Sequence, residues 1–166
     1  MNTTQKISSC LWFDKNAEEA VDFYLSVFKH SRKLSTTYYS KEGEEYHHMP
    51  DGTVLAIDFE LNGSTFIALN AGPIFKFNES VSFVVNCETQ EEIDYYWDKL
   101  TPGGDIKAQQ CGWLKDKFGL SWQVTPTAMQ RMLMSRDRAQ ADRVMHVMMQ
   151  MKKLDLKTLQ DAYDGK

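Results

Sequence analysis

A polar amide in the middle of an apolar strand is the first candidate for chemistry in this chain. The segment CGWLKDKFGLSWQVTP runs from Cys111 to Pro126 and predicts two short strands joined at DKFG, with Gln123 between Trp122 and Val124 in the second. A side-chain amide both donates and accepts hydrogen bonds, so Gln123 can bind a neutral or anionic small molecule. It can equally satisfy neighbouring backbone groups or water, and the residues alone leave both interpretations open.

The other residue types that carry chemistry form no known catalytic pattern. His47 and His48 are adjacent, and adjacent strand residues point to opposite faces, so the pair is not expected to chelate one ion. One of them could still reach a cleft as a proton carrier. Cys87 and Cys111 have no histidine nearby in the sequence and are expected to be inert, buried thiols. No G-x-S-x-G, H-E-x-x-H or P-loop motif occurs, so those nucleophilic, zinc and nucleotide mechanisms lack support.

Composition and charge restrict the class of protein. Hydrophobic residues make up 42% of the chain and aromatic residues 12%, which predicts a packed globule. A net charge of −4 without a basic block argues against nucleic-acid and anionic-membrane partners. No apolar run is long enough to span a membrane, and MNTTQKISSC lacks the layout of a signal peptide. Three cysteines without paired spacing complete the expectation of a soluble, reduced, cytoplasmic protein.

An internal repeat determines the expected fold. The first half predicts a strand at 6–13, a helix at 16–28, and strands at 31–40, 53–61 and 64–70. The second half predicts a strand at 80–87, a helix at 89–100, and strands at about 105–115 and 120–125. EAVDFY at 19–24 matches EEIDYY at 91–96 at the same place in each half. We therefore expect an α+β fold over 1–126, with βαβββ repeats at 6–72 and 80–126 that form curved mixed sheets, each covered by its helix.

After Pro126 the pattern becomes helical. Apolar residues recur at helical spacing, namely Ala141, Val144, Met145, Met148 and Met149. Asp155 is placed to cap a last short helix. Because methionine fills irregular gaps in cores and interfaces, we expect residues 127–166 to be a helical extension that covers the domain or forms a dimer contact.

Four segments together make the chain resemble the vicinal oxygen chelate superfamily, which includes the glyoxalases and bleomycin-resistance proteins. More closely, it resembles the PhnB-like branch, often given the description 3-demethylubiquinone-9 3-methyltransferase domain. The segments are NAEEAVDFYLSVF (16–28), FNESVSFVVNCETQEEIDYYWDKL (77–100), CGWLKDKFGLSWQVTP (111–126) and RVMHVMMQMKKLDLKTLQDAY (143–163). The resemblance implies two βαβββ modules around a cleft, often in a homodimer. In metal-dependent members, His or Glu residues from the first and last strands of each module hold a divalent ion, which stabilises an anion formed on the substrate.

The resemblance also gives Gln123 a position in the family pattern. Many relatives carry D-x-x-G before the last strand and a ligand Glu four residues later; Asp116 and Gly119 match that turn, so Gln123 is the amide counterpart of the ligand. The other three ligand positions align by eye near Ser9, Ala68 and Ser82. Two hydroxyls, a methyl group and a neutral amide are poor ligands for a divalent cation, so we expect no metal.

Strand alternation completes the expected ligand site. Phe66 and Asn70 share one face of their strand, and the expected cleft wall joins them with Phe13, Gln123 and Trp113. An apolar wall with a few polar groups is typical of a small-molecule site. Ordinary core packing is the alternative role for each aromatic side chain.

Three hypotheses about function follow. The first is a metal-independent small-molecule-binding protein of the glyoxalase/bleomycin-resistance type, without a cofactor and with its activity unassigned. The second is a lyase, isomerase or transferase of the same superfamily with an unusual metal site that includes His47 or His48. The third is a dimeric scaffold whose methionine-rich tail binds a partner. A methyltransferase of the common adenosylmethionine class needs a glycine-rich turn after its first parallel strand, and this chain has only isolated DG, NG and GG turns.

Overall fold

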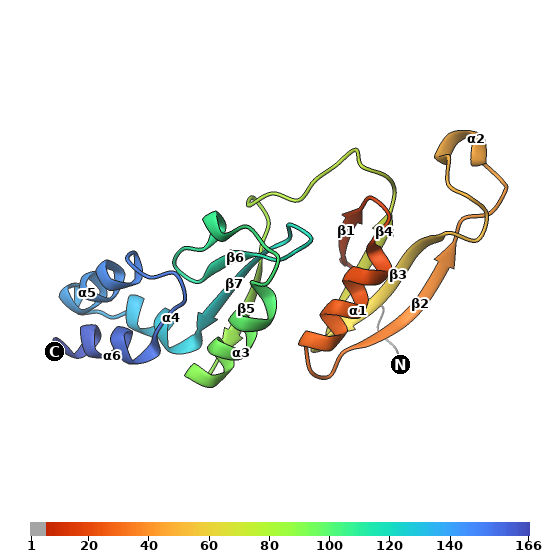
Figure 1. Ribbon diagram of the computed structural model, residues 1–166. Coiled ribbons are helices and arrows are strands. Elements are labelled where there is room, and N and C mark those ends of the chain that lie inside the picture. The colour runs from red at the N-terminus through yellow and green to blue at the C-terminus, as the bar shows by residue number, and fades with distance from the viewer. Residues whose placement is uncertain (1–5) are drawn as a thin grey trace. The chain divides into compact units, whose positions relative to one another are not determined.

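The computed structural model describes residues 6–166 and divides into two compact units, one ending at Lys76 and the other spanning Phe77–Lys166 (Figure 1). Each unit has its own mixed β-sheet and its own helix packed on that sheet. The α+β expectation is therefore confirmed, and the helical extension belongs to the second unit. No helix among residues 6–166 is long and apolar enough to cross a membrane.

Unit 1 is the first βαβββ repeat. Its elements are β1 (Ser9–Phe13), α1 (Ala17–Val27), β2 (Arg32–Tyr38), α2 (Glu44–His47), β3 (Val54–Leu61) and β4 (Ser64–Asn70). The strand order is β1-β4-β3-β2, in which β1 runs parallel to β4 and the other pairs are antiparallel. Helix α1 buries an apolar face against the sheet, and the Tyr24 ring stacks on Phe59 with centroids 6.5 Å apart. Helix α2 lies in the polar connection where only a turn was expected.

Unit 2 begins with the second repeat. Its elements are β5 (Phe83–Cys87), α3 (Gln90–Leu100), the short 3-10 helix η1 (Ile106–Ala108), β6 (Trp113–Lys115) and β7 (Ser121–Pro126). The order is β5-β7-β6, with β5 parallel to β7 and β6 antiparallel to it. As in unit 1, the first strand pairs in parallel with the last, so the two repeats share this feature of their topology.

The predicted strand at about 105–115 is much shorter than expected. The Asp105 carboxylate accepts a hydrogen bond from Lys107 N at 2.9 Å and starts η1 instead of a strand. Gln110 and Trp113 then close a tight turn, in which Cys111 has a φ of 52° and Gly112 a φ of 85°. The sheet of unit 2 therefore has three strands, and β6 is its short edge.

The extension consists of three helices that share a small core of their own. They are α4 (Thr127–Leu133), α5 (Arg138–Met148) and α6 (Leu156–Asp164), and they lie together at the end of unit 2 (Figure 1). Their core contains Met132, Val144, Leu154 and Leu159. Asp155 caps α6 as predicted, because its carboxylate accepts a hydrogen bond from Thr158 N at 2.7 Å.

Backbone and side-chain hydrogen bonds attach the α5–α6 connection to the rest of unit 2. Cys111 N donates to Met151 O, and Gly112 N donates to Lys152 O, both at 2.8 Å. At the start of α3, the Gln90 amide accepts a hydrogen bond from Leu156 N at 2.8 Å and donates one to Leu154 O at 3.3 Å. The extension is therefore part of the fold of unit 2.

Candidate functional site on the open face of the second sheet

A buried carboxylate shapes the turn between β6 and β7. Asp116 Oδ1 accepts hydrogen bonds from Phe118 N at 2.9 Å and Leu120 N at 3.0 Å, and Oδ2 accepts one from Trp122 Nε1 at 2.9 Å. Gly119 has a φ of 85°, which is the left-handed region that favours glycine. The D-x-x-G motif is thus a structural turn, and it fixes the start of the strand that carries Gln123.

Gln123 lies in a row of three side chains across the sheet. Its Cα partners are Trp113 on β6 and Val84 on β5, and side chains directly opposite each other point to the same face. Gln123 Nε2 donates a hydrogen bond to Ser82 Oγ at 2.9 Å. Val84 is 51% exposed, whereas Trp122 and Val124 are buried on the face that α3 covers. Gln123 therefore lies on the face of this sheet that α3 leaves open.

The next row on the open face is more polar. Ser121 lies opposite Lys115 and points to the same side as Gln123, two residues further along β7. The Lys115 ammonium forms an ion pair with Glu79, which lies in the loop before β5. The Ser121 hydroxyl is buried and has no hydrogen-bond partner. Lys115 was not singled out from the sequence, although its two-residue spacing from Trp113 places both on one face.

The residues of the first repeat that were expected to line a ligand site lie on the face of their sheet that α1 covers. Phe13, Phe66 and Asn70 are buried, and the Phe66 ring stacks on Phe59 at 5.4 Å between centroids. Asn70 Oδ1 accepts a hydrogen bond from Ala17 N at 2.9 Å, at the first residue of α1. The structure therefore places these three residues in the core under α1.

Asn70 caps α1 although it lies on a distant strand. Asn16 is at the N-cap position of α1 but makes no side-chain capping hydrogen bond. The Asn70 amide caps the helix from β4 instead, and its Nδ2 donates to Val54 O at 3.0 Å. Both polar atoms of the side chain are thus satisfied by backbone groups from distant segments, which explains how a polar residue is buried here.

Replacing Asn70 with alanine should lower the free energy of unfolding of unit 1 by about 3 kcal/mol, because it leaves a buried N–H and a buried C=O without partners. Urea denaturation followed by circular dichroism would measure the change. The control is Asn86→Ala, which truncates an exposed residue on β5 and should cost less than about 0.5 kcal/mol. Equal losses in the two variants would contradict the structural role of Asn70.

The strand registers also correct two of the family metal-ligand positions, which the sequence comparison placed near Ser9 and Ala68. Phe13 pairs with Asn70 at the ends of β1 and β4, and Cys87 pairs with Pro126 at the ends of β5 and β7. Counting back from these matching ends, Gln123 corresponds to Ile67 and Ser82 corresponds to Ser8. Each position is one residue away from the aligned Ala68 and Ser9, and a shift of one residue moves a side chain to the other face of a strand.

This donor set does not fit a divalent metal ion. It consists of two serine hydroxyls, an isoleucine side chain and an amide whose Nε2 already donates to Ser82, whereas divalent cations need carboxylate, imidazole or thiolate ligands. Among residues 6–166, no three His, Cys, Asp or Glu side chains gather as they would around a metal. His47 lies in α2, where its Nδ1 accepts a hydrogen bond from Met49 N at 3.0 Å and its ring lies 4.5 Å from Tyr39.

The structure also gives little support for catalysis by the Cys87 thiol or for adenosylmethionine binding. Burial raises the pKa of Cys87 to about 12, so this side chain is a protonated thiol at neutral pH. In the described part of the chain, no glycine lies between β1 and α1 or between β5 and α3, where a backbone would have to approach adenosylmethionine closely. The strand orders β1-β4-β3-β2 and β5-β7-β6 are not those of a doubly wound sheet.

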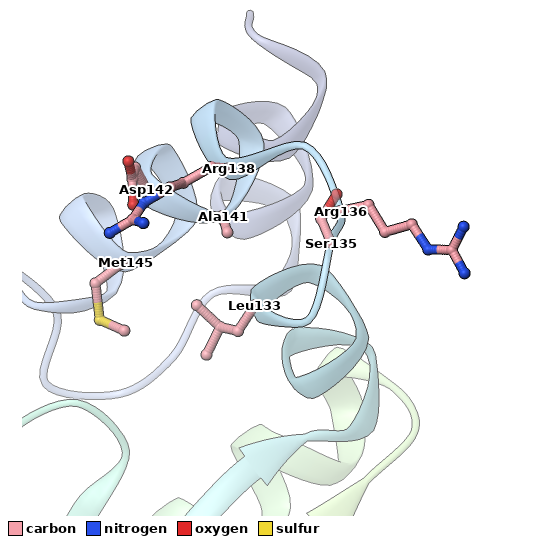
Figure 2. Close-up of a pocket in the computed structure, with 7 residues that line it drawn as sticks. All are labelled: Leu133, Ser135, Arg136, Arg138, Ala141, Asp142 and Met145. Carbon is pink, nitrogen blue, oxygen red and sulfur yellow. The ribbon is translucent and has the colours of Figure 1, made fainter.

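A hollow of about 440 Å³ lies in the extension, between α4 and α5 (Figure 2). Its lining residues are Leu133, Ser135, Arg136, Arg138, Ala141, Asp142 and Met145. Arg136 points away from the other labelled side chains, and the Ser135 hydroxyl donates to Gln140 Oε1 at 2.9 Å. None of the residues that line the hollow belongs to the row around Gln123.

Comparison with known proteins identifies the family. The family model described as 3-demethylubiquinone-9 3-methyltransferase matches residues 5–125. A PhnB protein from Bacillus cereus with the same description is 38% identical, with 74% of this chain and 100% of that chain covered and a TM-score of 0.65. A protein from Pseudomonas aeruginosa, 17% identical with a TM-score of 0.57 and 74% and 98% of the two chains covered, shows likeness of fold alone. No curated protein matches the chain. The chain therefore belongs to the 3-demethylubiquinone-9 3-methyltransferase family, in the PhnB-like branch that its sequence resembles.

Proposed function

We propose that this protein is a metal-independent small-molecule-binding protein of the glyoxalase/bleomycin-resistance type, and that its site is the open face of the β5-β7-β6 sheet. The observation that carries the proposal is the Gln123–Ser82 hydrogen bond, with the Trp113 ring beside it. Among the described residues, no group donates a hydrogen bond to Gln123 Oε1, so this oxygen is available to a ligand. The indole offers an apolar surface on which a planar ligand can stack.

A screen of small metabolites by thermal shift would test the site. Ligands that stabilise the wild-type protein should lose at least about tenfold in affinity for Gln123→Ala, because the variant lacks both the amide donor and the amide acceptor. The matched control is Gln130→Ala, which removes the same side chain from an exposed position on α4 and should bind normally. Ligands that bind Gln123→Ala and the wild-type protein equally would contradict this site.

Metal independence has its own measurement. Dialysis against a chelator should leave Tm unchanged, and added divalent ions should not raise it, because the family ligand positions hold neutral side chains. Elemental analysis of protein purified without chelators should find no stoichiometric metal. A stoichiometric transition metal, together with a rise of several degrees in Tm on adding that ion back, would contradict the proposal.

The expected homodimer and cytoplasmic location belong to the same proposal. Cys10, Cys87 and Cys111 are free thiols, which supports a reducing environment. Met134, Met145 and Met149 are exposed on or beside α4 and α5, which supports a contact between two copies that sedimentation equilibrium would test.

A further inference from the structure

A buried hydroxyl without a partner lies next to the Gln123 site. Ser121 is 1% exposed, and its Oγ makes no hydrogen bond. Buried polar atoms are normally hydrogen-bonded, so an exception needs a physical explanation such as a missing ligand or water. Because Ser121 and Gln123 are two residues apart on β7, this hydroxyl and the Gln123 amide are on the same face of the sheet.

A lysine lies directly opposite Ser121 on that face. The Lys115 side chain is 19% exposed, and its ammonium is paired with the Glu79 carboxylate. Glu79 is 61% exposed and lies in the loop before β5, where Asn78 Oδ1 accepts a hydrogen bond from Ser80 N at 3.0 Å. The hydrogen bond from Lys115 holds the pKa of Glu79 below its usual range, so Glu79 is ionised at neutral pH.

The Lys115–Glu79 ion pair joins a largely buried lysine side chain to a largely exposed carboxylate. Ion pairs with a solvent-exposed partner contribute little net stability. A ligand carboxylate can therefore replace Glu79 at Lys115 at small cost, and Glu79 then returns to water. In the same position the ligand can accept the hydrogen bond that the Ser121 hydroxyl leaves unmade.

We propose that Lys115 and Ser121 form an anion-binding subsite beside Gln123 and Trp113, so that the protein binds a small organic anion and Glu79 occupies the subsite when the ligand is absent. The inference rests on the proposed function, because it adds a charge requirement to the same sheet face. A charge-assisted hydrogen bond from an ammonium to an oxyanion is stronger than a bond between neutral groups, so the subsite should discriminate between an acid and its amide.

Benzoate and benzamide are the probes that separate the two claims, because they share a planar ring and differ in charge. Titration followed by ¹H–¹⁵N spectra would report on the Gln123 amide and the Trp113 indole. Benzoate should bind Lys115→Gln about tenfold more weakly than the wild-type protein. It should also bind Ser121→Ala more weakly, and it should bind Glu79→Gln several-fold more tightly because its competitor has lost its charge.

The charge-matched control is Lys117→Gln. Lys117 is an exposed lysine in the turn after β6, so this variant changes the net charge equally and should bind benzoate like the wild-type protein. Benzamide binding should be insensitive to all four substitutions. Equal benzoate affinity in Lys115→Gln and Lys117→Gln would overturn the anion subsite.

The remaining outcomes distinguish the two proposals. If benzamide shifts the Gln123 and Trp113 signals and benzoate does not, the small-molecule site stands and the anion subsite is wrong. If benzoate shifts neither signal even in Glu79→Gln, the anion subsite is also wrong, and the Gln123→Ala metabolite screen alone then decides the proposed function.

Discussion

Replacing Asp116 with alanine should lower the free energy of unfolding of unit 2 by about 4 kcal/mol. The carboxylate is buried and accepts hydrogen bonds from two backbone N–H groups and the Trp122 indole. The alanine variant therefore leaves three donors without an acceptor. Urea denaturation followed by circular dichroism would measure this loss of stability. The thermal-shift screen should in addition show weaker ligand binding by this variant, because the turn sets the position of Ser121 and Gln123.

Two further variants test whether the loss of stability in Asp116→Ala follows from the number of hydrogen bonds removed. Asp116→Asn keeps one acceptor oxygen and should lose about half as much stability as the alanine variant. Asp105→Ala removes an exposed carboxylate with one backbone hydrogen bond and should cost about 1 kcal/mol or less. A loss below 1 kcal/mol in Asp116→Ala would show that the turn does not depend on this side chain.

Replacing Gly104 with alanine should also be strongly destabilising, with a loss of about 3 kcal/mol or more in the free energy of unfolding. A Cβ at this position would lie 1.8 Å from the Lys115 carbonyl oxygen and 2.9 Å from its carbonyl carbon. Both atoms are backbone atoms of β6, so the clash can be relieved only by moving the strand away from the turn after α3. The melting temperature and the soluble yield would both fall, and the Lys115 side chain would be displaced.

Gly119→Ala separates this steric effect from the conformational freedom of glycine. Gly119 has a positive φ, but a Cβ there would meet nothing within 4 Å. The substitution should therefore cost only about 1 kcal/mol, from backbone strain. If Gly119→Ala were the more damaging of the two, the close approach of Gly104 to β6 would be wrong.

Hydrophobic periodicity and turn signals were sufficient to predict most elements of the fold. The predicted strands at 53–61 and 64–70, separated by Asn62–Gly63, correspond to β3 and β4 almost residue for residue. The predicted helix at 89–100 corresponds to α3. The prediction of one strand at about 105–115 was wrong, because Asp105 starts a 3-10 helix and Cys111 adopts a positive φ. Neither feature can be recognised from a pattern of apolar residues.

The sequence was sufficient to predict which face of β7 carries Gln123, but it was not sufficient to predict the surroundings of Asn70 on β4. In β7, tryptophan, valine and proline alternate with polar residues, so Gln123 could be assigned to the uncovered face. In β4, both faces carry apolar residues, because Phe66 and Ala68 alternate with Ile67 and Leu69. The polar Asn70 suggested a ligand contact, but its partners are the backbone groups of Ala17 and Val54, which only the folded structure brings near.

The hydrogen bonds of Gln90 bear on the order in which the protein can fold during synthesis. Unit 1 has all its strands by Asn70, so it can fold as soon as that part of the chain has left the ribosome. Unit 2 differs, because its first helix binds the backbone of Leu154 and Leu156, 64 and 66 residues later. The hydrogen bonds at the start of α3 can therefore form only after the α5–α6 connection has been translated, although all strands of unit 2 are present by Pro126.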